Sequence, residues 1–290
     1  MNIRSIKERA DQLLVDCKPQ LIRTIMIVSL LGLVPNLFSS TENTILSLVV
    51  RLLFLTVGHG IVVSTLKVVR NNAFALSDDD VFVGFTRIKD LFSTYFVSLI
   101  VVRLVIYALV FLLFVIFGTI LGSYINLQSL LAMTSSIDIA ATQLAQLLMS
   151  VPSLIFFLLI IFMIVFIASI LMSAYVFFMP YLKEQYHMSA GQSLKESFSL
   201  MSGHVWEFIK LELSFLGWVI IAVFIQVIVT EVLSFMPILG TMIGSIAATI
   251  FSVYTYVPKY KLSQAIFFEE LAYYRYEVQS ANQGDFYNVE

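Results

Sequence analysis

Long apolar runs separated by short polar segments dominate the pattern along the chain. A bilayer core of about 30 Å needs roughly 20 mostly apolar residues in a helix, because backbone groups in lipid must be paired within the segment. Six runs meet this requirement: residues 21–38, 45–68, 95–121, 152–179, 208–230 and 238–256. The pattern predicts an all-α fold, a polytopic membrane helix bundle with six transmembrane helices, built as one integral membrane domain over residues 1–290.

A short amphipathic segment precedes spans one, three and five, and another follows span six. Each of the first three begins with a serine and has an acid or amide three residues later, which is the pattern of a helix capping box: Ser5 with Glu8, Ser77 with Asp80, and Ser189 with Gln192. We expect these helices to lie at the membrane interface with their apolar faces toward lipid. Residues 257–290 are expected to form a cytoplasmic amphipathic tail.

The connection between spans three and four is the longest polar interruption. Residues 126–148 have apolar positions at helical spacing and a single charge, Asp138. Two interpretations remain open, an external helix that lies on the bilayer or caps the bundle, and an ordinary connecting loop.

Lysine and arginine follow a one-sided distribution over the connections. They occur before span one, in or beside the connections that follow spans two and four, and after span six. The other three connections, residues 39–44, 122–151 and 231–237, contain none. The positive-inside rule then places the N- and C-termini in the cytoplasm. Six alternating spans require both termini to lie on one side of the membrane, which agrees with this placement.

Composition excludes several classes of function. The 17 basic and 19 acidic residues are nearly balanced, so no basic field favours nucleic acid. The single cysteine, Cys17, forms neither an internal disulfide nor a cysteine zinc site. Asp78, Asp79 and Asp80 suggest a metal cluster, but acids in the first turn of a helix are explained by its positive end. We therefore expect no metal and no cofactor.

Charges inside the predicted spans are the main candidates for a site, because each costs about 2.5–3.5 kcal/mol on the insertion scale unless it is paired or hydrated. Arg103 lies near mid-depth in span three and Glu212 in the inner part of span five; Arg51 and Glu231 lie nearer the outer surface. Two pairs at different depths, Arg103 with Glu212 and Arg51 with Glu231, would stabilise the bundle or line a polar path for a solute or lipid. Snorkelling to the interface is the other explanation, and it suits Arg103 poorly.

Catalytic motifs are absent by inspection: the histidines fall in no HExxH spacing, and no G-x-S-x-G, P-loop or GxGxxG occurs. We expect no enzyme. Small residues instead indicate close helix packing, with Gly118 and Gly122 in one ridge and Gly240 and Gly244 in another. These ridges serve packing within the chain or formation of a homodimer.

The stretch SLKESFSLMSGHVWEFIKLELSFLGW, residues 193–218, joins an amphipathic segment to span five. Gly203 is expected to end the first helix in the left-handed conformation. His204 and Trp206 then lie at headgroup level, and Gly217 opens a close-packing position one turn into lipid. The stretch is interpreted as the base of a membrane helix and not as a catalytic element.

The sequence of residues 193–218 also resembles that of a known family. Together with IKERADQLL near the start, VFVGFTRIKDLF before span three and VPKYKLSQAIFFEEL after span six, it resembles the bacterial integral membrane family called domain of unknown function 975. The resemblance covers most of the chain and implies a multi-pass protein of the bacterial plasma membrane. It implies no catalytic residue.

Two functions follow as expectations. The first is a non-enzymatic scaffold or accessory factor for envelope or transport machinery, with the lipid bilayer and other membrane proteins as partners. The second is a carrier or flippase for a small solute or lipid, with Arg103 and Glu212 at its polar centre.

Overall fold

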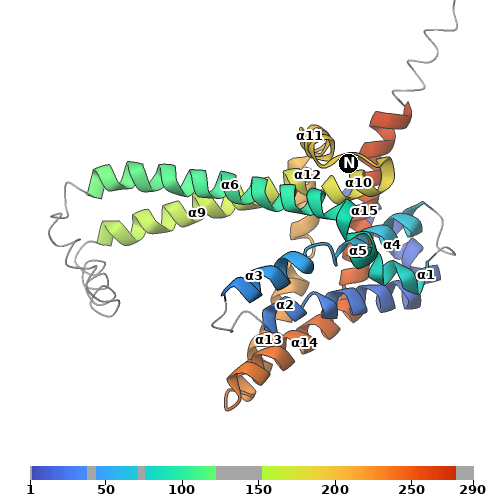
Figure 1. The fold of residues 1–290 in the computed structure, drawn as a ribbon, viewed down its shortest axis with the longest axis horizontal. Coiled ribbons are helices and arrows are strands. Elements are labelled where there is room, and N and C mark those ends of the chain that lie inside the picture. The colour runs from blue at the N-terminus through green and yellow to red at the C-terminus, as the bar shows by residue number, and fades with distance from the viewer. Residues whose placement is uncertain (1, 38–43, 71–75, 122–151, 279–290) are drawn as a thin grey trace, which may run out of the picture. The chain divides into compact units, whose positions relative to one another are not determined.

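The computed structural model describes residues 2–37, 44–70, 76–121 and 152–278, and every regular element in these ranges is a helix (Figure 1). The first half contains α1 (Ile3–Leu31), α2 (Val34–Leu37), α3 (Thr44–Leu53), α4 (His59–Val69), the 3-10 helix η2 (Asp78–Phe82), α5 (Val83–Thr86) and α6 (Ile88–Leu121). The second half contains α9 (Pro152–Val176), α10 (Met179–Tyr186), α11 (Ala190–Met201), α12 (Val205–Leu213), α13 (Leu216–Val232), α14 (Pro237–Thr255), α15 (Val257–Ala272) and the π-helical η4 (Tyr273–Val278). The all-α prediction is confirmed for these residues. The segment 126–148 lies outside them.

Three helical stretches of the described chain are long and apolar enough to cross a membrane: Cys17–Asn36, Ile88–Leu113 and Leu158–Tyr186. Two bent pairs raise the number to as many as five, namely Val205–Leu213 with Leu216–Val232, bent by 46°, and Leu239–Thr255 with Val257–Tyr276, bent by 61°. Such long apolar helices are typical of a membrane protein.

The predicted second span, 45–68, does not form one helix. It divides into α3 and α4, with turns between them, and nine of the eleven α4 residues are buried. The Thr56 hydroxyl in this break donates to the Gly84 carbonyl at 2.6 Å. The apolar character of this run thus reflects burial against protein along α4, which hydropathy alone does not distinguish from burial in lipid.

The chain divides into two compact units, residues 1–98 with 174–290 and residues 99–173. In the first unit, α1 packs along α15, α4 and α14, while α13 and α14 form a close pair (Figure 1). Its core is rich in aromatic rings, among them Phe178, Phe208, Phe267 and Phe268. The second unit consists of most of α6 and α9, and many of its apolar side chains are exposed.

The first amphipathic segment and the first span are one continuous helix, α1. The predicted capping box of Ser5 and Glu8 is wrong, because the helix begins three residues earlier: Asn2 is the N-cap, and its side chain accepts from the Arg4 N–H at 3.0 Å. Glu8 pairs instead with Arg4 at 2.8 Å. The expected apolar face, which includes Ile6, Ala10 and Cys17, is buried in the protein core.

The other two capping boxes are confirmed. Ser77 accepts from the Asp79 N–H while Asp80 accepts from the Ser77 N–H, although the element they begin is the 3-10 helix η2. Ser189 and Gln192 form the box at the start of α11. The buried face of α11 includes Ser197, whose hydroxyl donates to the Tyr175 carbonyl at 2.6 Å, so this helix too packs against protein.

The helix after the predicted sixth span differs from the expected amphipathic tail. In α15 the side chains of Leu262, Ala265, Ile266, Phe267 and Phe268 are fully buried, although they do not lie on one face. Contacts with α1, α4, α12 and α14 surround this helix. Residues 257–272 therefore form the centre of the first unit, and residues 279–290 lie outside the described ranges.

Candidate functional site: a buried polar network around His59

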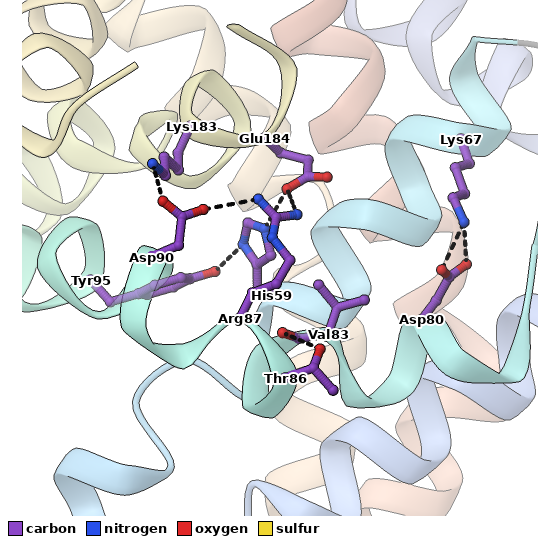
Figure 2. A network of polar contacts seen from close by, with 10 residues as sticks. All are labelled: His59, Lys67, Asp80, Val83, Thr86, Arg87, Asp90, Tyr95, Lys183 and Glu184. Atoms are coloured by element: carbon purple, nitrogen blue, oxygen red, sulfur yellow. Dashed lines mark hydrogen bonds and ion pairs between the residues drawn. The ribbon is translucent and has the colours of Figure 1, made fainter. Parts of the chain in front are cut away.

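Six side chains from three places in the sequence meet in the first unit (Figure 2). We call them the His59 network: His59 of α4, Arg87 before α6, Asp90 and Tyr95 of α6, and Lys183 and Glu184 of α10. The network fastens α4, the start of α6 and α10 to one another.

His59 is the most enclosed member, with a fully buried side chain. Its Nε2 lies 2.9 Å from Glu184 Oε2, and its Nδ1 lies 3.0 Å from the Tyr95 hydroxyl. An ionised carboxylate only accepts hydrogen bonds, so Nε2 carries the proton and donates to Glu184. With the proton on Nε2, Nδ1 can accept from the Tyr95 hydroxyl, so both ring nitrogens have a hydrogen-bond partner.

The charged members alternate in sign. Glu184 Oε2 also accepts from Arg87 at 2.7 Å; Arg87 donates to Asp90 at 3.1 Å; and Lys183 pairs with Asp90 at 2.5 Å. Two cations therefore face two anions, and the network carries no net charge when His59 is neutral. Partial burial lowers the pKa of Arg87, but the hydrogen bond and charge of Glu184, followed by those of Asp90, raise it above its usual value overall. The guanidinium stays charged.

The local sequence places these groups through two glycines. A Cβ on Gly60, one residue after His59, would lie 2.5 Å from the Asp80 carbonyl oxygen. A Cβ on Gly84 would overlap the Thr56 carbonyl. Because both residues lack a side chain, η2 and α5 can approach the start of α4, which brings Arg87 to the carboxylate of Glu184.

A second contact joins α4 to η2. Lys67 Nζ lies 2.7 and 3.0 Å from the two carboxylate oxygens of Asp80, which is buried. Asp80 also accepts from the Ser77 backbone N–H at 3.1 Å. The acidic run at 78–80 is thus engaged in ion pairing and capping, since Asp78 pairs with Arg23 at 3.2 Å. Within the described ranges, no group of three or more His, Cys, Asp or Glu side chains is arranged to hold a metal ion.

Glu212 lies at a third polar cluster, between α12 and α15. Its carboxylate accepts from the Tyr260 hydroxyl and, at 2.7 Å, from the Gln264 amide. Lys261 donates to Gln264 Oε1 at 2.9 Å and lies 4.8 Å from the centre of the Tyr260 ring. Glu212 therefore has two partners within its own unit.

Comparison with known proteins gives one match. The sequence profile of the family described as "Protein of unknown function (DUF975)" matches residues 2–273. The chain belongs to the DUF975 family. No curated protein and no solved structure matches this family member.

The other predicted charges of this DUF975 protein are exposed. Arg103 lies in the second unit, and the expected pair with Glu212 of the first unit stays a prediction. Arg51 and Glu231 are both exposed, and the described part of the chain shows no ion pair between them. The second expected pair is thus not formed in this structure.

The stretch before α13 has the features expected of a helix junction. Gly203 adopts a positive φ of 88° after α11. His204 Nδ1 lies 2.9 Å from Glu207 Oε2, and Trp206 is 62% exposed with Lys210 5.6 Å from its ring centre. A Cβ on Gly217 would meet no atom of the described chain within 4 Å, so no close packing is seen there.

The glycine ridge of α14 faces α13. A Cβ on Gly240 would lie 2.8 Å from the Leu233 carbonyl oxygen, and one on Gly244 would lie 2.5 Å from the Thr230 hydroxyl. This contact uses the ridge within the chain. Gly118 lies in α6, and Gly122 lies outside the described residues.

The sequence analysis did not identify the His59 network. Arg87 and Lys183 were considered only in the distribution of positive charges, and His59 only as a histidine that belongs to no catalytic motif. Two signals were present: a histidine within an apolar run, and the pair Lys183–Glu184 shortly after the end of the fourth apolar run at residue 179. A charge of each sign at such a position indicates burial with partners.

Proposed function

We propose that this family member is a non-enzymatic, multi-pass protein of the bacterial plasma membrane and acts as a scaffold or accessory factor for envelope or transport machinery. In this proposal the chain crosses the membrane six times, with α3 and α4 forming a broken second crossing and both termini in the cytoplasm. In this proposal the His59 network has a structural role and stabilises the packing of α4, α6 and α10 in the first unit.

The observation that carries the proposal is the exposure of Arg103 on an apolar helix. It lies within the candidate span Ile88–Leu113, and none of the residues in an 18-residue apolar stretch of this span is buried. Leu104, Tyr107 and Phe111 share its face, at helical spacing, and each is at least 63% exposed. Among the described residues of the second unit, no ion pair or hydrogen bond to the Arg103 side chain is seen.

A charge in a membrane span costs about 2.5–3.5 kcal/mol unless it is paired or hydrated. A partner helix that supplies a carboxylate removes this cost and covers the aromatic face around Tyr107. The proposal therefore assigns the partner surface to the Arg103 face of α6, defined by Arg103, Leu104, Tyr107 and Phe111.

Site-specific photo-cross-linking in intact membranes tests the proposal. With the photoreactive residue at Leu104 or Phe111, we expect one discrete protein adduct, which disappears in Arg103→Leu and persists in Arg103→Lys. Arg51→Leu, a charge removal in α3, is the matched control and should leave the adduct unchanged. Only lipid adducts at both positions would contradict the scaffold role.

The carrier or flippase has weaker support, because Tyr260 and Gln264 already bind the Glu212 carboxylate. It predicts that Arg103 approaches Glu212. A disulfide between Arg103→Cys and Glu212→Cys, formed in a Cys17→Ser background, would favour it and would count against an external partner for Arg103. In that case, loss of the folded protein in each leucine variant and its recovery in the double variant would identify a structural pair.

A further inference from the structure

A groove of about 360 Å³ lies between α1, α13 and α14. All three helices belong to candidate membrane spans or bent pairs of helices. The groove is lined by apolar residues together with a set of uncharged polar side chains: Ser29, Asn36, Gln226, Ser245, Thr249 and Ser252. Among the residues that the structure describes, no charged side chain lines it.

The polar side chains on α14 face the groove mainly as acceptors. The hydroxyl groups of Ser245, Thr249 and Ser252 each donate to the carbonyl four residues earlier, at 2.9, 2.8 and 2.7 Å. Their donor capacity is used within the helix, whereas oxygen lone pairs remain. A ligand in the groove therefore meets acceptors that are offered by a rigid helix.

Gln226 of α13 adds to the same preference. Its Nε2 donates one N–H to the Ser245 hydroxyl at 3.2 Å, which leaves Oε1 as a strong acceptor, and one further N–H, beside the groove. A phosphate group presents only acceptors and a negative charge, and it would find no cation here. A group with several O–H donors fits the lining better.

We propose that this groove binds an uncharged glycolipid of the glycosyl diacylglycerol class. The sugar hydroxyl groups donate to Gln226, Thr249 and Ser252, and the apolar wall, which includes Val219 and Val223, contacts the hydrocarbon part. The polar positions on α14 extend about 10 Å from Ser245 to Ser252 at 1.5 Å per residue. This length suits a sugar joined to glycerol and exceeds what the single hydroxyl of diacylglycerol uses.

Native mass spectrometry of the full chain, purified and presented with defined lipids, tests the proposal. The probes are monoglucosyl diacylglycerol, diacylglycerol, phosphatidylglycerol and phosphatidylcholine. We expect monoglucosyl diacylglycerol to bind about tenfold more tightly than phosphatidylcholine. Gln226→Leu and Thr249→Val should each weaken its binding about fivefold, as is typical of one lost hydrogen bond.

Matched variants separate a lost contact from a lost fold. Thr249→Ser keeps the hydroxyl and should bind as the wild type does, and Thr255→Val removes a hydroxyl of the same helix that does not line the groove. Equal binding of all four lipids, or preference for phosphatidylglycerol, would overturn the proposal. A disulfide between two copies carrying Val223→Cys in a Cys17→Ser background, without glycolipid binding, would identify the groove as a helix–helix interface and would overturn it equally.

Discussion

The imidazole of His59 meets the carboxylate of Glu184 at 2.9 Å, although 125 positions separate the two residues along the chain. The contact joins the first turn of α4 to α10, and the same carboxylate oxygen accepts from Arg87 at 2.7 Å. One oxygen atom therefore connects three segments of the first unit. The partners are buried or half-buried, so these hydrogen bonds contribute more than surface ion pairs do.

Glu184→Gln is expected to destabilise the protein by about 2–3 kcal/mol, because it weakens two hydrogen bonds that involve a charged acceptor. Unfolding by sodium dodecyl sulfate in mixed micelles, followed by tryptophan fluorescence, measures the change. Glu8→Gln is the matched control: its pair with Arg4 is exposed and should contribute less than about 1 kcal/mol. Equal effects of the two substitutions would contradict a structural role for the network.

Gly84→Ala and Gly60→Ala are expected to destabilise the fold: a Cβ on Gly84 in α5 would overlap the Thr56 carbonyl before α4, and one on Gly60 in α4 would crowd the Asp80 carbonyl of η2. Overpacking of this kind costs about 1–3 kcal/mol. Gly58→Ala is the control, because a Cβ there would meet nothing of the described chain within 4 Å and the backbone is right-handed. The yield of monodisperse protein after mild heating reports the difference; wild-type behaviour of Gly84→Ala would show that α5 moves aside.

The helical class and most apolar runs could be predicted from the sequence, because long unbroken hydropathy is a local property. What the sequence could not show is which side of an apolar helix faces protein. The stripe of Ile6, Ala10 and Cys17 is amphipathic for the reason expected, a difference between two environments, but its apolar side meets α15 and α4 in the core. Helical periodicity is the same whether the apolar face meets lipid or protein.

Asp80→Asn is expected to destabilise the protein by about 3 kcal/mol, because it removes the negative charge from the partly buried Lys67–Asp80 ion pair and weakens the cap of η2. Asp79→Asn removes an adjacent, exposed carboxylate and should change stability by less than about 0.5 kcal/mol. The two variants have the same net charge, so a difference between their unfolding midpoints isolates the ion pair. Equal unfolding midpoints would indicate that other contacts of Lys67 stabilise the protein when the charge of Asp80 is removed.

The candidate site was less accessible to sequence reasoning than the fold, for a physical reason. Hydropathy identifies a charge as costly, as for Arg103 and Glu212, but the partner that compensates it is set by tertiary contacts. Glu212 pairs with Tyr260 and Gln264, residues assigned by their pattern to a surface tail. Long-range pairs of this kind have no fixed spacing, unlike the capping boxes at Ser77 and Ser189, which span three residues and were predicted correctly.

The burial of α15 gives the sharpest distinction between a surface tail and a core helix. Phe267 is fully buried and lies with its ring 5.4 Å from that of Phe208 and 6.1 Å from that of Phe178. Phe267→Ala should therefore destabilise the protein by about 3–5 kcal/mol, the usual cost of removing a buried ring.

Tyr274→Ala is the control for this prediction, because Tyr274 is 69% exposed in η4, directly after α15. Its loss should change stability by no more than about 0.5 kcal/mol. A helix that lies on the membrane surface would tolerate both substitutions without unfolding the rest of the chain. A selective loss of stability in Phe267→Ala, measured by the same detergent unfolding, therefore places α15 inside the protein; tolerance of both would return it to the membrane surface.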